Sequence, residues 1–177
     1  QVNTNKLLRK YEGCTGLKTG STTTALFNLS ATATRNDLSL IAVVMRADTS
    51  SIRFAEAKTL LDYGFSNFEY LKYSNKGDLA KEILVNKGTL NSLEIVFENN
   101  AGSIIPKGQS ANIVTTVSLP EILEAPVYKG DVVGKVVFSL NDEVLGSVNL
   151  VANDTVKKLN LGNMLAHVVE SWFTLLR

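Results

Sequence analysis

The sequence has a single cysteine, Cys14, which excludes a disulfide within the chain and a cysteine metal cluster. It has no apolar run of about 18 residues, the length that a membrane-spanning helix would need. The net charge is +1 and no long basic run is present, so there is no electrostatic basis for nucleic-acid binding. No signal peptide is visible at Gln1. We therefore expect no cofactor, no metal site and no nucleic-acid partner.

The composition is that of an ordinary globular protein. Hydrophobic residues make up 45% of the chain and charged residues 20%, which is enough apolar material for a packed core. A length of 177 residues fits one or two domains. The pattern changes after Phe68, so we expect residues 1–68 and 69–158 to be separate domains.

Residues 1–68 predict three strands followed by a helix. The predicted strands span residues 17–24, 27–35 and 38–47, with Asn36-Asp37 as a two-residue turn between the last two. The third strand is almost continuously apolar, which is typical of a strand covered on both faces.

The predicted helix has N-cap candidates at residues 48–51 and should end at Gly64. Its apolar stripe consists of Phe54, Ala57, Leu60 and Leu61.

Residues 69–158 contain at least five short apolar runs between turn signals, which predicts an all-β sandwich or barrel. These runs cover residues 80–85, 93–98, 111–119, 131–140 and 144–151. The last part of the chain, residues 159–177, predicts a helix that is amphipathic from Leu161 to Arg177 and carries Trp172 on its apolar face. Such a helix fits a bilayer interface, its own domain or a second subunit.

The most informative motif is Lys18-Thr19-Gly20, at the start of the first predicted strand. Side chains alternate along a strand, so Lys18 and Gly20 share one face and Thr19 points to the other. Gly20 also leaves room for another extended chain beside the strand edge. A cation, a hydroxyl and a bare backbone edge together suit a peptide that carries a carboxylate.

The motif and its surroundings resemble the serine-type D-alanyl-D-alanine carboxypeptidases, for which Lys-Thr-Gly is the third conserved motif. The resemblance rests on four further segments in the same order: Asn3 to Leu8, Ala31 to Arg35, Leu40 to Met45 and Ile52 to Phe65. The stretch Ala125 to Gly130, followed by Val133-Gly134, resembles the small sandwich domain of these enzymes. One departure is Leu26, where relatives commonly have glycine, and this leucine is expected to crowd the strand.

The resemblance implies an α+β fold. Residues 1–68 would be the final strands and helix of a β-lactamase/transpeptidase-like catalytic domain, and the all-β sandwich and the amphipathic C-terminal helix would follow. It also implies the family's activity, the removal of the terminal D-alanine from peptidoglycan stem peptides through a serine acyl-enzyme, which β-lactams also acylate.

The resemblance also implies roles for individual residues. Lys18 would supply positive potential near the nucleophile, and Thr19 would bind the substrate carboxylate. Ser21 would contribute its backbone N–H to the oxyanion hole. Arg53 would help to hold the carboxylate, because a guanidinium matches that planar anion; the alternative for Arg53 is a surface salt bridge.

The other two motifs of the family are missing from this chain. No serine is followed by lysine three residues later, so the Ser-x-x-Lys nucleophile is absent. Three Ser-x-Asn matches, at Ser110, Ser139 and Ser147, come after Lys-Thr-Gly and are chance matches. This chain alone is therefore expected to be inactive.

Two alternatives to the carboxypeptidase remain: a serine β-lactamase relative, and a non-catalytic extracytoplasmic module that interacts or anchors through its sandwich. The resemblance places the protein in the bacterial cell envelope, peripheral at the outer face of the cytoplasmic membrane through residues 161–177. We also expect an apolar face and an unpaired strand edge in residues 1–68, which a second chain or a dimer partner would cover.

Overall fold

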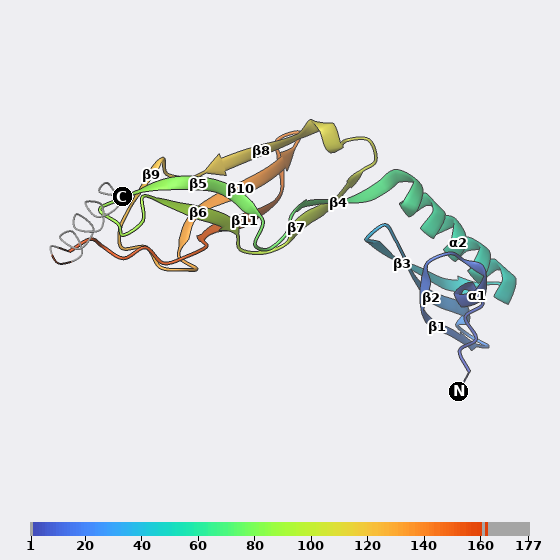
Figure 1. The fold of residues 1–177 in the computed structure, drawn as a ribbon. Helices are drawn as coiled ribbons and strands as arrows, with labels where there is room; N and C mark the ends of the chain where they lie inside the picture. The colour runs from blue at the N-terminus through green and yellow to red at the C-terminus, as the bar shows by residue number, and fades with distance from the viewer. Residues whose placement is uncertain (1, 161, 163–177) are drawn as a thin grey trace. The chain divides into compact units, whose positions relative to one another are not determined.

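The computed structural model describes residues 2–160 and 162 (Figure 1). The chain forms two compact units. Unit 1 consists of Gln1–Leu71 and Ile104–Ala111, and unit 2 consists of Lys72–Ser103 and the chain from Asn112 onward. The predicted domain boundary at residue 68 and the terminal segment from residue 159 stay predictions. Most of that terminal segment lies outside the described residues.

Unit 1 contains the three predicted strands, which form one antiparallel sheet in the order β1-β2-β3. They are β1 (Cys14–Thr22), β2 (Leu26–Arg35) and β3 (Leu38–Ala47). Asn36 and Asp37 join β2 to β3 with φ angles of 48° and 63°, both in the left-handed region that a tight hairpin turn requires. The predicted turn is therefore confirmed.

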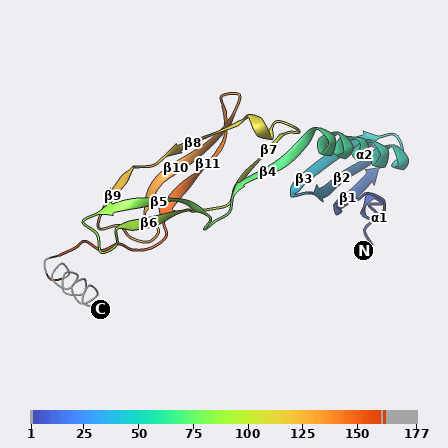
Figure 2. The same cartoon turned by 45° about the horizontal axis from the view of Figure 1, so that its top comes forward.

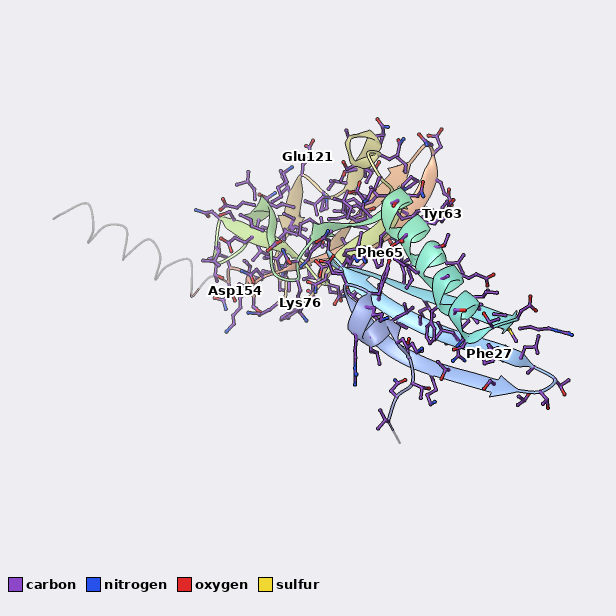
Figure 3. The ribbon with its side chains drawn as sticks, turned by 90° about the vertical axis from the view of Figure 1, so that its right-hand side faces the viewer. Phe27, Tyr63, Phe65, Lys76, Glu121 and Asp154 are labelled. Carbon is purple, nitrogen blue, oxygen red and sulfur yellow. The ribbon has the colours of Figure 1, made fainter. Side chains whose placement is uncertain are left out.

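Helix α2 (Ser50–Asn67) covers one face of this sheet (Figure 1). Its N-cap is Thr49, whose hydroxyl accepts a hydrogen bond from the backbone N–H of Ile52 at 3.3 Å. Phe27 of β2 and Phe65 of α2 belong to the core between helix and sheet, whereas Tyr63 is 63% exposed (Figure 3). A short helix, α1 (Leu7–Lys10), adds Leu7 to this core.

The expected helix end at Gly64 is wrong. The helix continues to Asn67, and Gly64 is buried within it, beside Leu40 of β3. A Cβ atom at position 64 would lie 2.5 Å from Leu40 Cδ1, so this glycine serves the close approach of helix and sheet.

The other face of the sheet is open. Ile41, Val43 and Met45 of β3 are 69%, 59% and 77% exposed, so the expectation that this strand is covered on both faces is wrong for this chain. Their alternate neighbours Ala42 and Val44 are buried under α2. The pattern is apolar on both faces, but the described residues of unit 1 cover only one of them. The exposed apolar face expected for residues 1–68 is thus present.

Two further strands, β4 (Phe68–Ser74) and β7 (Ala101–Pro106), pair into a two-stranded sheet. The segment after β7 returns to the end of α2. Lys107 donates its backbone N–H to the carbonyl of Asn67 at 2.9 Å, and Gly108 donates to the Glu69 carboxylate at 3.2 Å. Residues 104–111 therefore belong to unit 1 although they follow 32 residues of unit 2.

Unit 2 contains a six-stranded sheet in the order β8-β10-β11-β6-β5-β9 (Figures 1 and 2). A short 3-10 helix, η1 (Ser110–Asn112), directly precedes strand β8. The strands are β5 (Leu79–Asn86), β6 (Ser92–Phe97), β8 (Ile113–Ser118), β9 (Ile122–Glu124), β10 (Val132–Leu140) and β11 (Glu143–Ala152). Alternate residues build one core around Ile95, Leu150 and Val156, all 0% exposed. The predicted α+β class with an all-β second part is confirmed.

Candidate functional site

The Lys-Thr-Gly triplet lies on β1, at the edge of the unit 1 sheet. Lys18 is paired with Ser30 and Thr19 with Leu29. Directly opposite residues share a face, so Thr19 lies on the helix-covered face and Lys18 on the open face, as the alternation predicts. Lys18 is exposed, and its Nζ donates a hydrogen bond to the carbonyl of Thr19 at 3.3 Å.

Gly20 leaves free space beside this edge. It is exposed, and a Cβ atom built there would meet nothing within 4 Å. Its φ is not in the left-handed region, so neither backbone geometry nor packing in the described part of the chain requires glycine here. A requirement for glycine would therefore come from a molecule that approaches this edge from outside.

Strand β1 is held by side-chain hydrogen bonds from Asn3, Thr4 and Asn5, and the sequence did not predict these contacts. Thr4 Oγ1 lies 2.6 Å from Thr19 Oγ1, so the two hydroxyls share a hydrogen bond. Asn3 Nδ2 donates to the carbonyl of Leu17 at 2.7 Å, and Asn5 Nδ2 donates to the carbonyl of Gly16 at 3.0 Å.

One of these residues, Asn5, has a recognisable local role in the sequence. Asn5 also accepts the backbone N–H of Leu7 at 3.0 Å and is 3% exposed. An asparagine just before a short helix is a typical turn and capping residue. The pattern indicates the local turn, but it does not reveal the longer contacts to β1.

Arg53 projects from α2 beneath the triplet and is 7% exposed. Its Nη1 donates to the carbonyls of Gly20 at 3.3 Å and Asn28 at 3.2 Å, and its Nη2 donates to Ser50 Oγ at 3.1 Å. The guanidinium also lies over the rings of Phe27 and Phe54, with its Cζ 5.4 Å and 4.9 Å from their centroids.

The alternative of a surface salt bridge for Arg53 is wrong. The ion pairs of the described residues are Lys58–Asp62 and Lys87–Glu124, and Arg53 belongs to neither. Arg53 Nε is buried and has no hydrogen-bond partner among the described residues. A buried cation that is held by carbonyls and aromatic rings leaves positive potential at the Gly20 end of the edge, which favours binding of an anion there.

Ser21 follows the triplet and is exposed, paired with Phe27 in β2. The role implied for it uses the backbone N–H, which any residue supplies. The departure at Leu26 has a backbone consequence: its φ is 51°, a left-handed value that glycine adopts more readily than leucine.

The remaining candidates have structural roles. Asn149 of one Ser-x-Asn match donates to the Glu98 carboxylate at 2.8 Å, and Asn141 of another occupies a turn with φ of 50°. Cys14 packs against the unit 1 core, and its Sγ lies 3.4 Å from the carbonyl of Gly16. His167 lies outside the described residues.

Within residues 2–160 and 162, no group of three or more His, Cys, Asp or Glu side chains is arranged to hold a metal ion. In the same residues, no helix is both long enough and apolar enough to cross a bilayer.

Comparison with family models gives two matches that divide the chain. Residues 1–49 match the D-alanyl-D-alanine carboxypeptidase family, and residues 68–158 match the C-terminal domain of penicillin-binding protein 5. The first match contains the Lys-Thr-Gly edge, and the second contains the six-stranded sheet.

Individual relatives agree with these matches. D-alanyl-D-alanine carboxypeptidase DacA of Haemophilus influenzae is 40% identical over 158 residues, covering 87% of this chain and 40% of the relative. DacF of Bacillus subtilis is 30% identical over 172 residues, covering 97% of this chain and 44% of the relative. The chain thus spans less than half the length of these curated relatives.

Two solved structures are similar to this chain. Penicillin-binding protein 5 from Haemophilus influenzae superposes with a TM-score of 0.69 and 37% identity, covering 86% of this chain and 45% of that protein. Penicillin-binding protein 6B from Escherichia coli superposes with a TM-score of 0.57 and 30% identity, covering 85% of this chain and 39% of that protein.

Proposed function

Because this chain belongs to the D-alanyl-D-alanine carboxypeptidase family that includes penicillin-binding protein 5, we propose that it forms the substrate-binding edge and sandwich domain of such an enzyme. The reaction is removal of the terminal D-alanine from peptidoglycan stem peptides. The observation that carries the proposal is the exposed Lys18-Thr19-Gly20 edge, which Arg53 holds from beneath by a hydrogen bond to the carbonyl of Gly20 at 3.3 Å.

The stem peptide lies extended along β1 and ends in a carboxylate. Thr19 donates its hydroxyl hydrogen to that carboxylate, and the positive charges of Lys18 and Arg53 stabilise it. The backbone N–H of Ser21 donates to the carbonyl oxygen of the scissile bond, which becomes an oxyanion when a serine attacks. The free D-alanine leaves, and water then hydrolyses the acyl-enzyme.

The attacking serine comes from polypeptide outside these 177 residues, because the chain has no Ser-x-x-Lys sequence. The same polypeptide, or a second chain, covers the open face formed by Ile41, Val43 and Met45. It also pairs with the outer edge of β3, with which no strand of the described residues pairs. Under this proposal, the chain is active only when it is joined to, or assembled with, the polypeptide that carries the serine.

The carboxypeptidase explains more observations than either alternative. A β-lactamase relative accounts for the Lys-Thr-Gly edge but not for residues 68–158, which match the penicillin-binding protein 5 C-terminal domain. A non-catalytic module accounts for the sandwich but not for a buried Arg53 that is aimed at the triplet.

The enzyme acts outside the cytoplasm, where peptidoglycan and β-lactams are found. It associates with the outer face of the cytoplasmic membrane through residues 161–177, whose amphipathic pattern fits a bilayer interface. The sandwich domain acts as the spacer between that segment and unit 1.

Labelling with a fluorescent penicillin tests the proposal. This chain alone should form no covalent adduct, whereas a polypeptide that extends it to include Ser-x-x-Lys should label and should release D-alanine. In the extended polypeptide, Thr19→Val should lower D-alanine release, while Thr34→Val, an exposed threonine of β2, should leave it unchanged. A covalent adduct on this chain alone, or full D-alanine release by Thr19→Val, would contradict the proposal.

A further inference from the structure

We propose that strand β8 of the sandwich is a docking edge, through which two copies of this chain pair antiparallel. This pairing is independent of the carboxypeptidase proposal, because it uses residues of unit 2 and none of the Lys-Thr-Gly edge. Strand β8 is the first in the order of the six-stranded sheet and pairs on one side with β10. Among the described residues, no strand pairs with its other side.

The composition of β8 suits strand pairing. Its residues are Ile113-Val114-Thr115-Thr116-Val117-Ser118, of which all but the serine are β-branched, and none is charged or proline. Five of the six are exposed, including Val114 at 59% and Val117 at 55%. The charged Lys135 lies one strand inward, opposite Ser118.

The opposite edge of the same sheet is protected in the usual ways. Strand β9 has three residues, lies between Pro120 and Pro126, and ends at Glu124. Glu124 forms an ion pair with Lys87, with 3.4 Å between Glu124 Oε1 and Lys87 Nζ. Short length, proline and charge are the features that prevent edge strands from pairing. The sheet therefore blocks one edge and leaves the other available.

A second copy of β8 fits this edge in sequence and in symmetry. A two-fold axis normal to the sheet places residues of the same face opposite one another, so Thr115 or Thr116 meets its own counterpart. On either register the neighbouring contacts join valine, isoleucine, threonine and serine, and no charge faces another charge. Pairing of six residues is smaller than a standard interface, so the dimer is weak and depends on concentration.

Sedimentation equilibrium of the full 177-residue chain tests the proposal. The wild-type chain should show a monomer–dimer equilibrium at concentrations up to about 1 mM. Thr116→Lys should raise the dissociation constant at least about tenfold, because two like charges then meet or nearly meet at the axis. Thr116→Val should leave it nearly unchanged. The matched control is Leu84→Lys, which replaces a 60% exposed leucine on β5 and should not affect dimerisation.

Crosslinking gives an independent readout of the contact. In a Cys14→Ser background, oxidation of Thr115→Cys or Thr116→Cys should give a disulfide-linked dimer for at least one of the two positions, whereas Leu84→Cys should not. A chain that stays monomeric, a dimer that Thr116→Lys leaves intact, or a dimer that Val43→Thr on the open unit 1 sheet dissociates would each overturn the proposal. Failure of penicillin labelling in an extended enzyme would leave it standing.

Discussion

Arg53 and Gly20 are joined by a hydrogen bond from the guanidinium Nη1 to the backbone carbonyl, 3.3 Å long. It ties the third residue of the Lys-Thr-Gly edge to helix α2. The same nitrogen also reaches the carbonyl of Asn28 on β2 at 3.2 Å. One buried cation therefore fixes the spacing of two adjacent strands at the point where the candidate site opens.

Replacing Arg53 should loosen the Lys-Thr-Gly edge. Arg53→Ala leaves the carbonyls of Gly20 and Asn28 without their donor and should cost about 2–4 kcal/mol of stability in unit 1. Arg53→Lys should be intermediate, because it keeps the charge but loses the fork of donors. Hydrogen exchange of the β1 amides measures the effect. Glu56→Ala, an exposed position on the same helix, is the control, and equal protection of β1 in all three variants would contradict the role.

Thr4 should position the hydroxyl of Thr19. Its Oγ1 lies 2.6 Å from Thr19 Oγ1, so Thr4→Val removes that hydrogen bond while keeping the shape of the side chain. In an extended, active polypeptide we expect kcat/KM for D-alanine release to fall about fivefold, the kinetic equivalent of about 1 kcal/mol. Thr4→Ser should restore most of the rate. Equal kcat/KM for Thr4→Val and the wild type would exclude a positioning role.

Tyr11 should make the stability of unit 1 sensitive to alkaline pH. Burial, and then the hydrogen bond from its hydroxyl to Asp62 at 2.8 Å, raise the pKa of Tyr11 to about 12. In the unfolded chain tyrosine ionises near pH 10, so this contribution is full below about pH 10 and is lost as the pH rises towards about 12. Urea midpoints of the wild type and Tyr11→Phe, measured across this range, should converge as the pH rises. A constant difference would contradict the assignment.

Asp62 should make the stability of unit 1 sensitive to acidic pH. Hydrogen bonds from Lys58 and then from Tyr11 lower its pKa below the ordinary 3.8. A lowered pKa adds stability at neutral pH that is lost as the pH falls through the folded-state value. The Asp62 side chain is 42% exposed, so solvent screens the effect and Asp62→Asn should cost less than about 1 kcal/mol at pH 7. Acid titration of the urea midpoint should show a shallower fall for Asp62→Asn than for the wild type.

The open face of unit 1 should bind hydrophobic dyes. Ile41 and Val43 are 69% and 59% exposed on β3, so replacing both with threonine keeps strand propensity and removes apolar surface. Fluorescence of a dye such as anilinonaphthalene sulfonate should fall, and stability should change by less than about 0.5 kcal/mol for each replacement. Ala42→Thr, at a 4% exposed neighbour, should instead destabilise the sheet. Dye fluorescence that the double variant leaves unchanged would show that this face is covered.

Local sequence patterns predicted the three strands and the long helix of unit 1 and five strands of unit 2, but not α1, β4, β7 or β9. The bounds of β3 agree with the predicted residues 38–47, and the Asn36-Asp37 turn has the expected left-handed geometry. Such features depend on neighbours in the chain, where periodicity and turn chemistry act directly. The triplet Lys18-Thr19-Gly20 was different, because its assignment to a substrate-binding edge rested on the resemblance to the carboxypeptidase family and not on strand periodicity alone.

Contacts between distant residues could not be predicted from these patterns. Gly64 reads as a helix end, but it is needed inside the helix for the approach of Leu40. Arg53 was expected to help hold a carboxylate or to form a surface salt bridge, and its enclosure by aromatic rings and by carbonyls of two strands was not foreseen. The apolar run of β3 indicates two covered faces, but its second cover is not among the described residues. In each case the decisive partner lies far away in sequence or is not among the described residues.

The return of residues 104–111 to unit 1 has a practical consequence for dissecting this protein genetically. Lys107 and Gly108 bond to Asn67 and Glu69, so the chain crosses from one unit to the other at three places. If the chain were divided at a single point near residue 68, residues 104–111 would be separated from unit 1 and the end of helix α2 would be exposed. To separate the two units, a short linker would have to join Ser103 to Asn112 in unit 2. Residues 104–111 would have to be fused to the polypeptide that contains unit 1.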